Sequence, residues 1–180
     1  LPACNTVIFD EAHQLPETAS LFFGESVSTS QLLDLMRDAK MEAIQAAGDF
    51  IALPDAIAAA EKAVRDLRLT IAEDNTRLSL VAIRQNRGFS DVLDNLLEKL
   101  AALAKLLESQ AERSEGLGNC WQRTTRHLQL MQRWRDETEM KDHVRWIEVY
   151  NQALQLNATP LSIAEIFQKQ MITSPRAWIF

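Results

Sequence analysis

The chain has 180 residues, of which 47% are hydrophobic, and a formal net charge of −6 at pH 7. This composition is that of a globular protein and excludes a uniformly basic surface for nucleic acid, although a local basic groove remains compatible with it. Its two cysteines, Cys4 and Cys120, are too few for a disulfide scaffold or a four-cysteine metal site, and we expect reduced thiols in a cytoplasmic protein. No apolar run approaches the length of a membrane span, so no membrane partner is expected.

The first predicted element is an apolar strand that runs directly into two carboxylates. Residues 7–13 read Val-Ile-Phe-Asp-Glu-Ala-His. Such a run suits a strand buried on both faces of a parallel sheet, and ligands of open α/β folds bind where these strands end. Asp10 is then placed to hold Mg²⁺ through water, and Glu11 to orient or deprotonate the water that attacks a γ-phosphate. The alternative is a core strand that ends in a solvated acidic turn.

The segment Asn5–Ala19 resembles motif II of the DinG/XPD family of iron–sulfur DNA helicases, with residues 10–13 as the DEAH form of the Walker B motif. The resemblance implies a parent protein that is an ATP-dependent DNA helicase using ATP and Mg²⁺. It further implies 5′ to 3′ translocation, a role in DNA repair or replication, and single-stranded or forked DNA as the partner. His13 would link the nucleotide site to the parts of the motor that respond to DNA. The parent would also carry a 4Fe–4S cluster, whose ligands lie outside this chain.

The sequence contains no Gly-x-x-x-x-Gly-Lys-Ser/Thr loop, which is the element that holds the phosphates of a bound nucleotide. We therefore expect this chain to be a piece of a larger ATPase and to hydrolyse no ATP by itself.

Residues 26–142 have apolar residues at helical spacing almost throughout, which predicts four helices. The expected buried stripes are Leu32, Met36, Ala39, Ala43 and Ala47; Ile57, Ala60, Val64, Leu67 and Ile71; Phe89, Leu93, Leu96, Leu100, Leu103 and Leu107; and Trp121, Leu128, Met131 and Trp134. Residues 75–88 are ambiguous, because they could extend the second helix or form a loop. The expected end signals are a capping box of Ser28 with Gln31, Gly48 after the first helix, Pro54 in the first turn of the second, and Ser90 and Asn119 as N-caps of the third and fourth.

The closing segment alternates in polarity and predicts a hairpin of residues 143–150 and 153–158, with a turn at Asn151. Val144, Trp146 and, as a third candidate, Glu148 should share one face of the first strand. A helix should follow Thr159-Pro160-Leu161, with Ser162 and Glu165 as its capping box, and residues 176–180 should form a final strand.

These elements predict a mainly α fold, in which a four-helix bundle is inserted in an α/β domain. The resemblance to the helicases implies that the bundle is arch-like and that the α/β domain is a RecA-like motor domain. Residues 1–25 would belong to motor domain 1, residues 26–142 to the arch, and residues 143–180 to the return into motor domain 1. In the helicase family the arch stands over the motor domain, and the single strand passes beneath it.

Two small groups of basic residues are candidate DNA contacts. Residues 116–135 contain Arg123, Arg126, Arg133 and Arg135 and no acidic residue, and Arg84 and Arg87 form a second group. Arginines here could meet phosphates beside stacked bases, or they could form a solvated basic face paired with acids of a neighbouring helix. Two other classes of function stay open: a helical module that binds a protein partner, and a nuclease-associated relative of the helicases.

Overall fold

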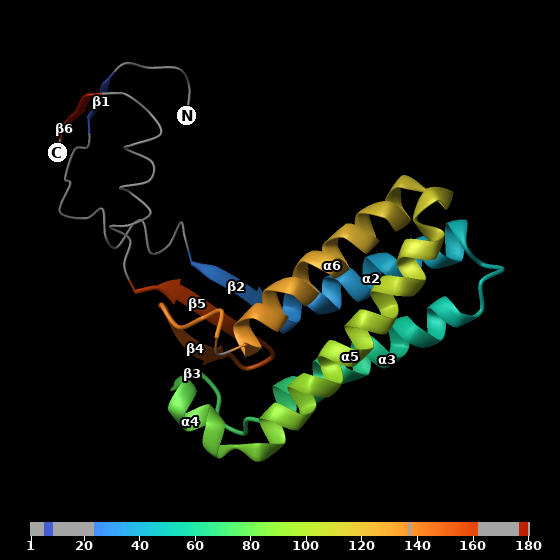
Figure 1. Cartoon of the computed structure of the whole chain (residues 1–180). Helices are drawn as coiled ribbons and strands as arrows, with labels where there is room; N and C mark the ends of the chain where they lie inside the picture. Colours follow the sequence, from blue (N-terminus) through green and yellow to red (C-terminus); the bar gives the residue numbers. More distant parts are fainter. Residues whose placement is uncertain (1–5, 9–23, 137, 162–176, 180) are drawn as a thin grey trace.

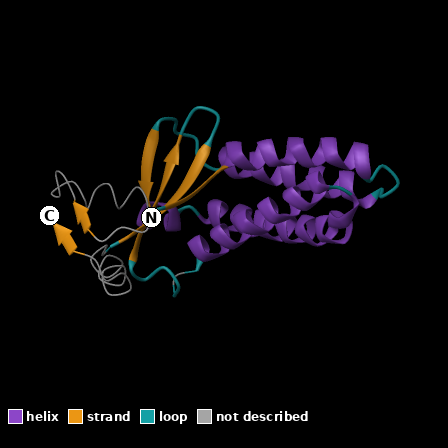
Figure 2. Ribbon diagram, turned by 90° about the horizontal axis from the view of Figure 1, so that it is seen from above, coloured by secondary structure: helices purple, strands orange, loops and turns teal. Residues whose placement is uncertain are grey.

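The computed structural model describes residues 6–8, 24–136, 138–161 and 177–179. Four long helices lie side by side, and a four-stranded sheet stands at one end of them (Figures 1 and 2). The helices are α2 (Thr29–Ala46), α3 (Ala52–Leu69), α5 (Arg87–Gln110) and α6 (Glu115–Arg135). Helix α2 packs on α3 and α6, and α5 packs on the same two helices, so the four close into a bundle. The prediction of four helices is confirmed.

The helix starts show which of the expected caps form. Gln31 donates its backbone N–H to Ser28 Oγ at 3.2 Å, and its own side chain accepts from the Ser28 N–H at 3.0 Å, which is the predicted capping box. Pro54 lies in the first turn of α3, as predicted. Gly48 follows Ala47, the C-cap of α2, but it does not adopt a left-handed φ.

The predicted N-caps of the last two long helices are wrong, by four residues for α5 and by five for α6. Helix α5 begins at Arg87, where the Asn86 side chain accepts from the Phe89 N–H at 3.2 Å, and not after Ser90. Helix α6 begins at Glu115, and not after Asn119.

Ser114 is the N-cap of α6, and its Oγ accepts from the Leu117 N–H at 3.0 Å. A Cβ on Gly116 would lie 2.0 Å from Cδ of Glu42, at the flexible end of a side chain of α2, so a larger residue here would require that side chain to move. Gly116 therefore lies in the first turn of α6, beside the side chain of Glu42.

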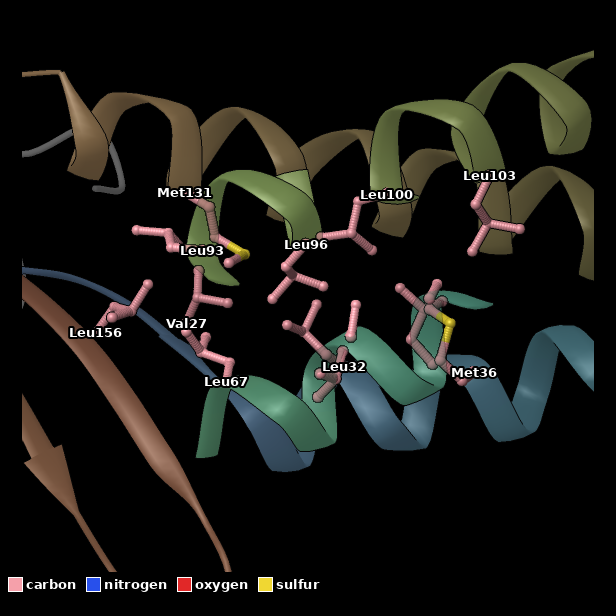
Figure 3. Packing of buried hydrophobic residues seen from close by; sticks show 14 of the residues in the cluster. Val27, Leu32, Met36, Leu67, Leu93, Leu96, Leu100, Leu103, Met131 and Leu156 are labelled. Atoms are coloured by element: carbon pink, nitrogen blue, oxygen red, sulfur yellow. The ribbon is translucent and has the colours of Figure 1, made fainter. Parts of the chain in front are cut away.

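The predicted stripes form the core of the bundle (Figure 3). All members of the first three stripes are buried, and so are Met131 and Trp134 of the fourth, while Trp121 and Leu128 are partly buried against the same core. In Figure 3 the labelled leucines of α5 lie in the core on the side opposite α2 and α3, and burial of such side chains is worth roughly 1.5–3 kcal/mol each. The core therefore holds the four helices together as one unit.

The sheet contains β2 (Glu25–Ser28), β3 (Thr76–Ser79), β4 (His143–Val149) and β5 (Leu154–Pro160), in the order β2-β5-β4-β3 with every pair antiparallel. The predicted hairpin is confirmed, and the Tyr150 N–H donates to the Ala153 carbonyl at 2.7 Å across its turn.

The structure matches neither alternative for residues 75–88. Asn75 has a left-handed φ of 52°, and the chain then forms strand β3 and the short helix α4 (Leu80–Gln85). Strand β3 forms because it pairs with β4. The local sequence could not predict this outcome, because β4 lies some 70 residues further along the chain.

The shared face predicted for β4 is confirmed, and the opposite face of the strand is the buried one. Val144 and Trp146 do share one face, but the buried residues of the strand are Arg145, Ile147 and Val149 on the other face. That inner face meets the helices, where Nη1 of Arg145 donates to the carbonyl of Trp134 at 2.5 Å. Hydrogen bonding to the backbone allows this guanidinium to be buried.

The hairpin is also tied to the bundle by two further hydrogen bonds. Thr29 Oγ1 of α2 accepts from the Leu154 N–H at 2.9 Å, and the indole N–H of Trp134 donates to the Asn157 carbonyl at 2.9 Å. Sheet and helices therefore share one hydrophobic core. The assignment of residues 143–180 to the motor domain stays a prediction.

A separate pair of strands joins the two ends of the chain. β1 (Thr6–Ile8) and β6 (Ala177–Ile179) pair in parallel, with Val7 opposite Trp178. Both were predicted as strands, and parallel pairing is the arrangement expected for an α/β domain. The helix expected with Ser162 and Glu165 lies outside the described residues.

Candidate functional site

The predicted nucleotide site follows strand β1. Asp10, Glu11 and His13 lie outside the described residues, so their roles stay predictions from the sequence. The described part of the strand ends at Ile8, two positions before Asp10, and it runs parallel to β6. The carboxylates thus follow the carboxyl end of a parallel strand, and carboxylate oxygens are the donors that Mg²⁺ prefers. The carboxylates of Asp10 and Glu11 are therefore of the right chemical type to hold Mg²⁺.

The arginines of α6 can be described individually, and three of them form ion pairs. Nη1 of Arg123 lies 2.6 Å from Oδ2 of Asp38 on α2, and Nη2 of Arg133 lies 2.5 Å from Oε1 of Glu25 on β2. Arg135 meets Asp94 on α5, with Nε and Nη2 at 3.0 and 3.2 Å from the two carboxylate oxygens.

These pairs link α6 to three neighbouring elements. All six side chains are roughly one-third to one-half exposed, so each pair should contribute only about 0–1 kcal/mol. The pairing is the second of the two arrangements expected from the sequence, a basic face matched by acids of neighbouring elements.

Arg126 differs from these three. Its side chain is exposed, and no carboxylate of the described residues lies within ion-pair distance of it. It lines an open groove between α6 and the start of β2. The other residues of this groove are Gly24, Glu25, Ser26, Gln129, Leu130 and Arg133. We call it the α6–β2 groove. The side chains of Arg84 and Arg87 lie outside the described part of the structure, so their role as DNA contacts stays a prediction.

His127 and Cys120 lie on the inner side of α6 and not in the groove. Burial, followed by the charges of Arg123 and Arg126, lowers the pKa of His127, and its Nδ1 is buried without a hydrogen-bond partner in the described structure. Burial raises the pKa of the Cys120 thiol despite the nearby Arg123 guanidinium. Both residues are therefore neutral at physiological pH and belong to the packing of the bundle.

Sequence reasoning missed Glu25, Ser26 and Gln129 as groove residues. The spacing of Gln129 from Arg126 and Arg133 places all three on one face of a helix, and this signal was available in the sequence. The contribution of Glu25 and Ser26 was not available, because it depends on β2 lying beside the end of α6.

Within the described residues, no three His, Cys, Asp or Glu side chains gather closely enough to hold a metal ion. A search of the same residues finds no helix with both the length and the apolar character that a bilayer crossing requires.

Comparison with known proteins confirms the resemblance seen in the sequence. The chain is 33% identical over 184 residues to the ATP-dependent DNA helicase YoaA of Escherichia coli K12, and 29% identical over 181 residues to the helicase of the same name from Haemophilus influenzae Rd. Both alignments cover the whole of this chain but only 28% of the helicase, so the chain matches about a quarter of these relatives. No protein-family profile matches the chain.

Proposed function

We propose that this chain is the section of an ATP-dependent DNA helicase of the DinG/XPD family that begins at motif II and continues through a helical arch. One observation carries the proposal. The Asp-Glu-Ala-His motif follows an apolar strand, within a chain that aligns over its whole length with two DNA helicases. The parallel pairing of β1 with β6 supports an α/β domain at the two ends of the chain.

In this proposal the chemistry rests on three side chains. Asp10 would hold Mg²⁺ through water, and the bound ion would supply positive charge to neutralise the phosphates of ATP. Glu11 accepts a hydrogen bond from the attacking water and orients it towards the γ-phosphate, or removes its proton. His13 lies after both carboxylates and connects the nucleotide site to the part of the motor that responds to DNA.

The helical bundle serves as the arch over the path of the single strand. Four packed helices with one common core form a rigid element, which suits a guide for DNA or a platform for a protein partner. We propose that the parent protein acts in the cytoplasm on single-stranded or forked DNA, moves 5′ to 3′, and serves DNA repair or replication. Its 4Fe–4S cluster would be held by residues beyond this chain.

The test is Glu11→Gln in the intact enzyme. We expect ATP turnover to be abolished while ATP still binds, because the amide keeps the size of the side chain but cannot accept the proton of the water. Glu17→Gln is the matched control, since it removes a carboxylate four residues after the Asp-Glu-Ala-His run and should leave turnover intact. Normal ATPase activity in Glu11→Gln would refute the proposed role.

A simple further assay separates the proposal from a helical module that only binds a protein partner. The intact protein should hydrolyse ATP faster when single-stranded DNA is present, whereas a binding module would show no ATPase activity at all.

A further inference from the structure

We propose that the α6–β2 groove binds the phosphodiester backbone of single-stranded DNA, with Arg126 as the principal contact and Gln129 and Arg133 beside it. The inference rests on the proposed helicase function and adds the surface that the single strand would touch. Of the four arginines of α6 that were candidate DNA contacts, it selects Arg126 and Arg133.

One face of α6 carries three of the polar side chains that line the groove. Arg126, Gln129 and Arg133 are spaced by three and four residues along α6, so their side chains lie along one face of the helix. Seven residues of helix span about 10.5 Å, which places the two guanidiniums at the two ends of a short polar row. Gly24 and Ser26 line the groove opposite this row.

Charge is unevenly distributed along the groove. Arg123 and Arg135 are occupied by Asp38 and Asp94, whereas Arg126 has no carboxylate partner in the described structure. Arg133 shares its charge with Glu25, whose second oxygen, Oε2, is buried without a hydrogen-bond partner. The groove therefore holds two guanidiniums and one carboxylate, and its unneutralised charge lies at the Arg126 end.

Neighbouring carboxylates limit where a phosphate can bind. Arg133 and Gln129 also line an adjoining hollow together with Gln132, Asp136 and Glu139. Two carboxylates on that side would repel a phosphate. The favourable position is thus the part of the groove between Arg126 and Gln129, where a guanidinium offers charge-assisted hydrogen bonds and the amide offers a neutral one.

The experiment uses the full 180-residue chain and a fluorescein-labelled oligodeoxythymidylate, with fluorescence anisotropy read over a series of salt concentrations. Loss of one phosphate contact should reduce the slope of the log association constant against the log salt concentration by about 0.7. This change in slope corresponds to about fivefold weaker binding at ~0.1 M salt. We expect this change in Arg126→Ala. Arg126→Lys should keep most of the slope, because it keeps the charge.

Two controls remove arginines that are already paired. Arg123→Ala lies on the same helix, and Arg65→Ala lies on α3, where Arg65 pairs with Glu61 at 2.6 Å. Both should leave the slope unchanged. A methylphosphonate oligonucleotide, which lacks backbone charge, should bind Arg126→Ala and the unmodified chain equally.

Three outcomes would overturn the inference: no salt-sensitive binding by the unmodified chain, equal effects of Arg126→Ala and Arg123→Ala, or a loss that persists with the uncharged oligonucleotide. None of these touches the ATPase result for Glu11→Gln, so failure of the groove and failure of the helicase proposal are distinguishable.

Discussion

Trp134 joins the helical bundle to the sheet, and its replacement tests whether the two parts are stabilised together. The side chain is 5% exposed, its indole N–H donates to the Asn157 carbonyl at 2.9 Å, and its ring meets Phe89 edge-on at 6.4 Å between centroids. Trp134→Phe removes the donor and part of the ring while it keeps an aromatic side chain in place. Trp121, which is only partly buried on the same helix, supplies the matched control in Trp121→Phe.

The expected loss for Trp134→Phe is the sum of two contributions. Loss of the buried hydrogen bond should cost about 1–1.5 kcal/mol. An unfilled space of roughly 40 Å³, at about 24 cal/mol per Å³, adds about 1 kcal/mol, so the free energy of unfolding should fall by about 2–2.5 kcal/mol. Trp121→Phe should cost less than about 1 kcal/mol, because its side chain is partly solvated and no hydrogen bond of its indole to another described residue is seen.

Urea unfolding of the full chain, followed by far-ultraviolet circular dichroism, measures both values without relying on tryptophan fluorescence. A single transition with a lower midpoint is expected for Trp134→Phe. Equal losses in the two variants would refute the reasoning, since they would show that the bond to Asn157 and the burial at the sheet add nothing.

Three further predictions concern pH, packing and the groove. Burial lowers the pKa of His127 in the folded chain, so the unfolded chain binds a proton at this residue first as the pH falls. The free energy of unfolding should therefore decline below about pH 6.5. Urea midpoints measured through that pH range should decline less in His127→Gln. Leu100→Ala removes a fully buried side chain and should lower the free energy of unfolding by about 2–5 kcal/mol. Ile44→Ala, at a position that is 66% exposed, should lower it by about 0.5 kcal/mol or less. Urea unfolding measures both values. Glu25→Gln should free Arg133 and strengthen salt-dependent binding of oligodeoxythymidylate, and unchanged or weaker binding in the same anisotropy assay would count against a phosphate site there.

The local patterns of the sequence determined the helices and their buried faces. The spacing of Leu93, Leu96 and Leu100 sufficed to predict both the helix and its core side, because a helical period can be read within a few turns. The capping box at Ser28 and the turn of the hairpin were predictable for the same reason, since each involves residues only a few positions apart. The strand before Asp10 was also readable from its apolar run.

Contacts between distant residues decided the rest. Strand β3 exists because β4 pairs with it, and the burial of Arg145 depends on its hydrogen bond to the carbonyl of Trp134. The arginines of α6 look equivalent in the sequence. Only the tertiary structure places Asp38, Glu25 and Asp94 beside three of them and leaves Arg126 facing the groove, because an ion pair depends on distance in space and not on spacing along the chain.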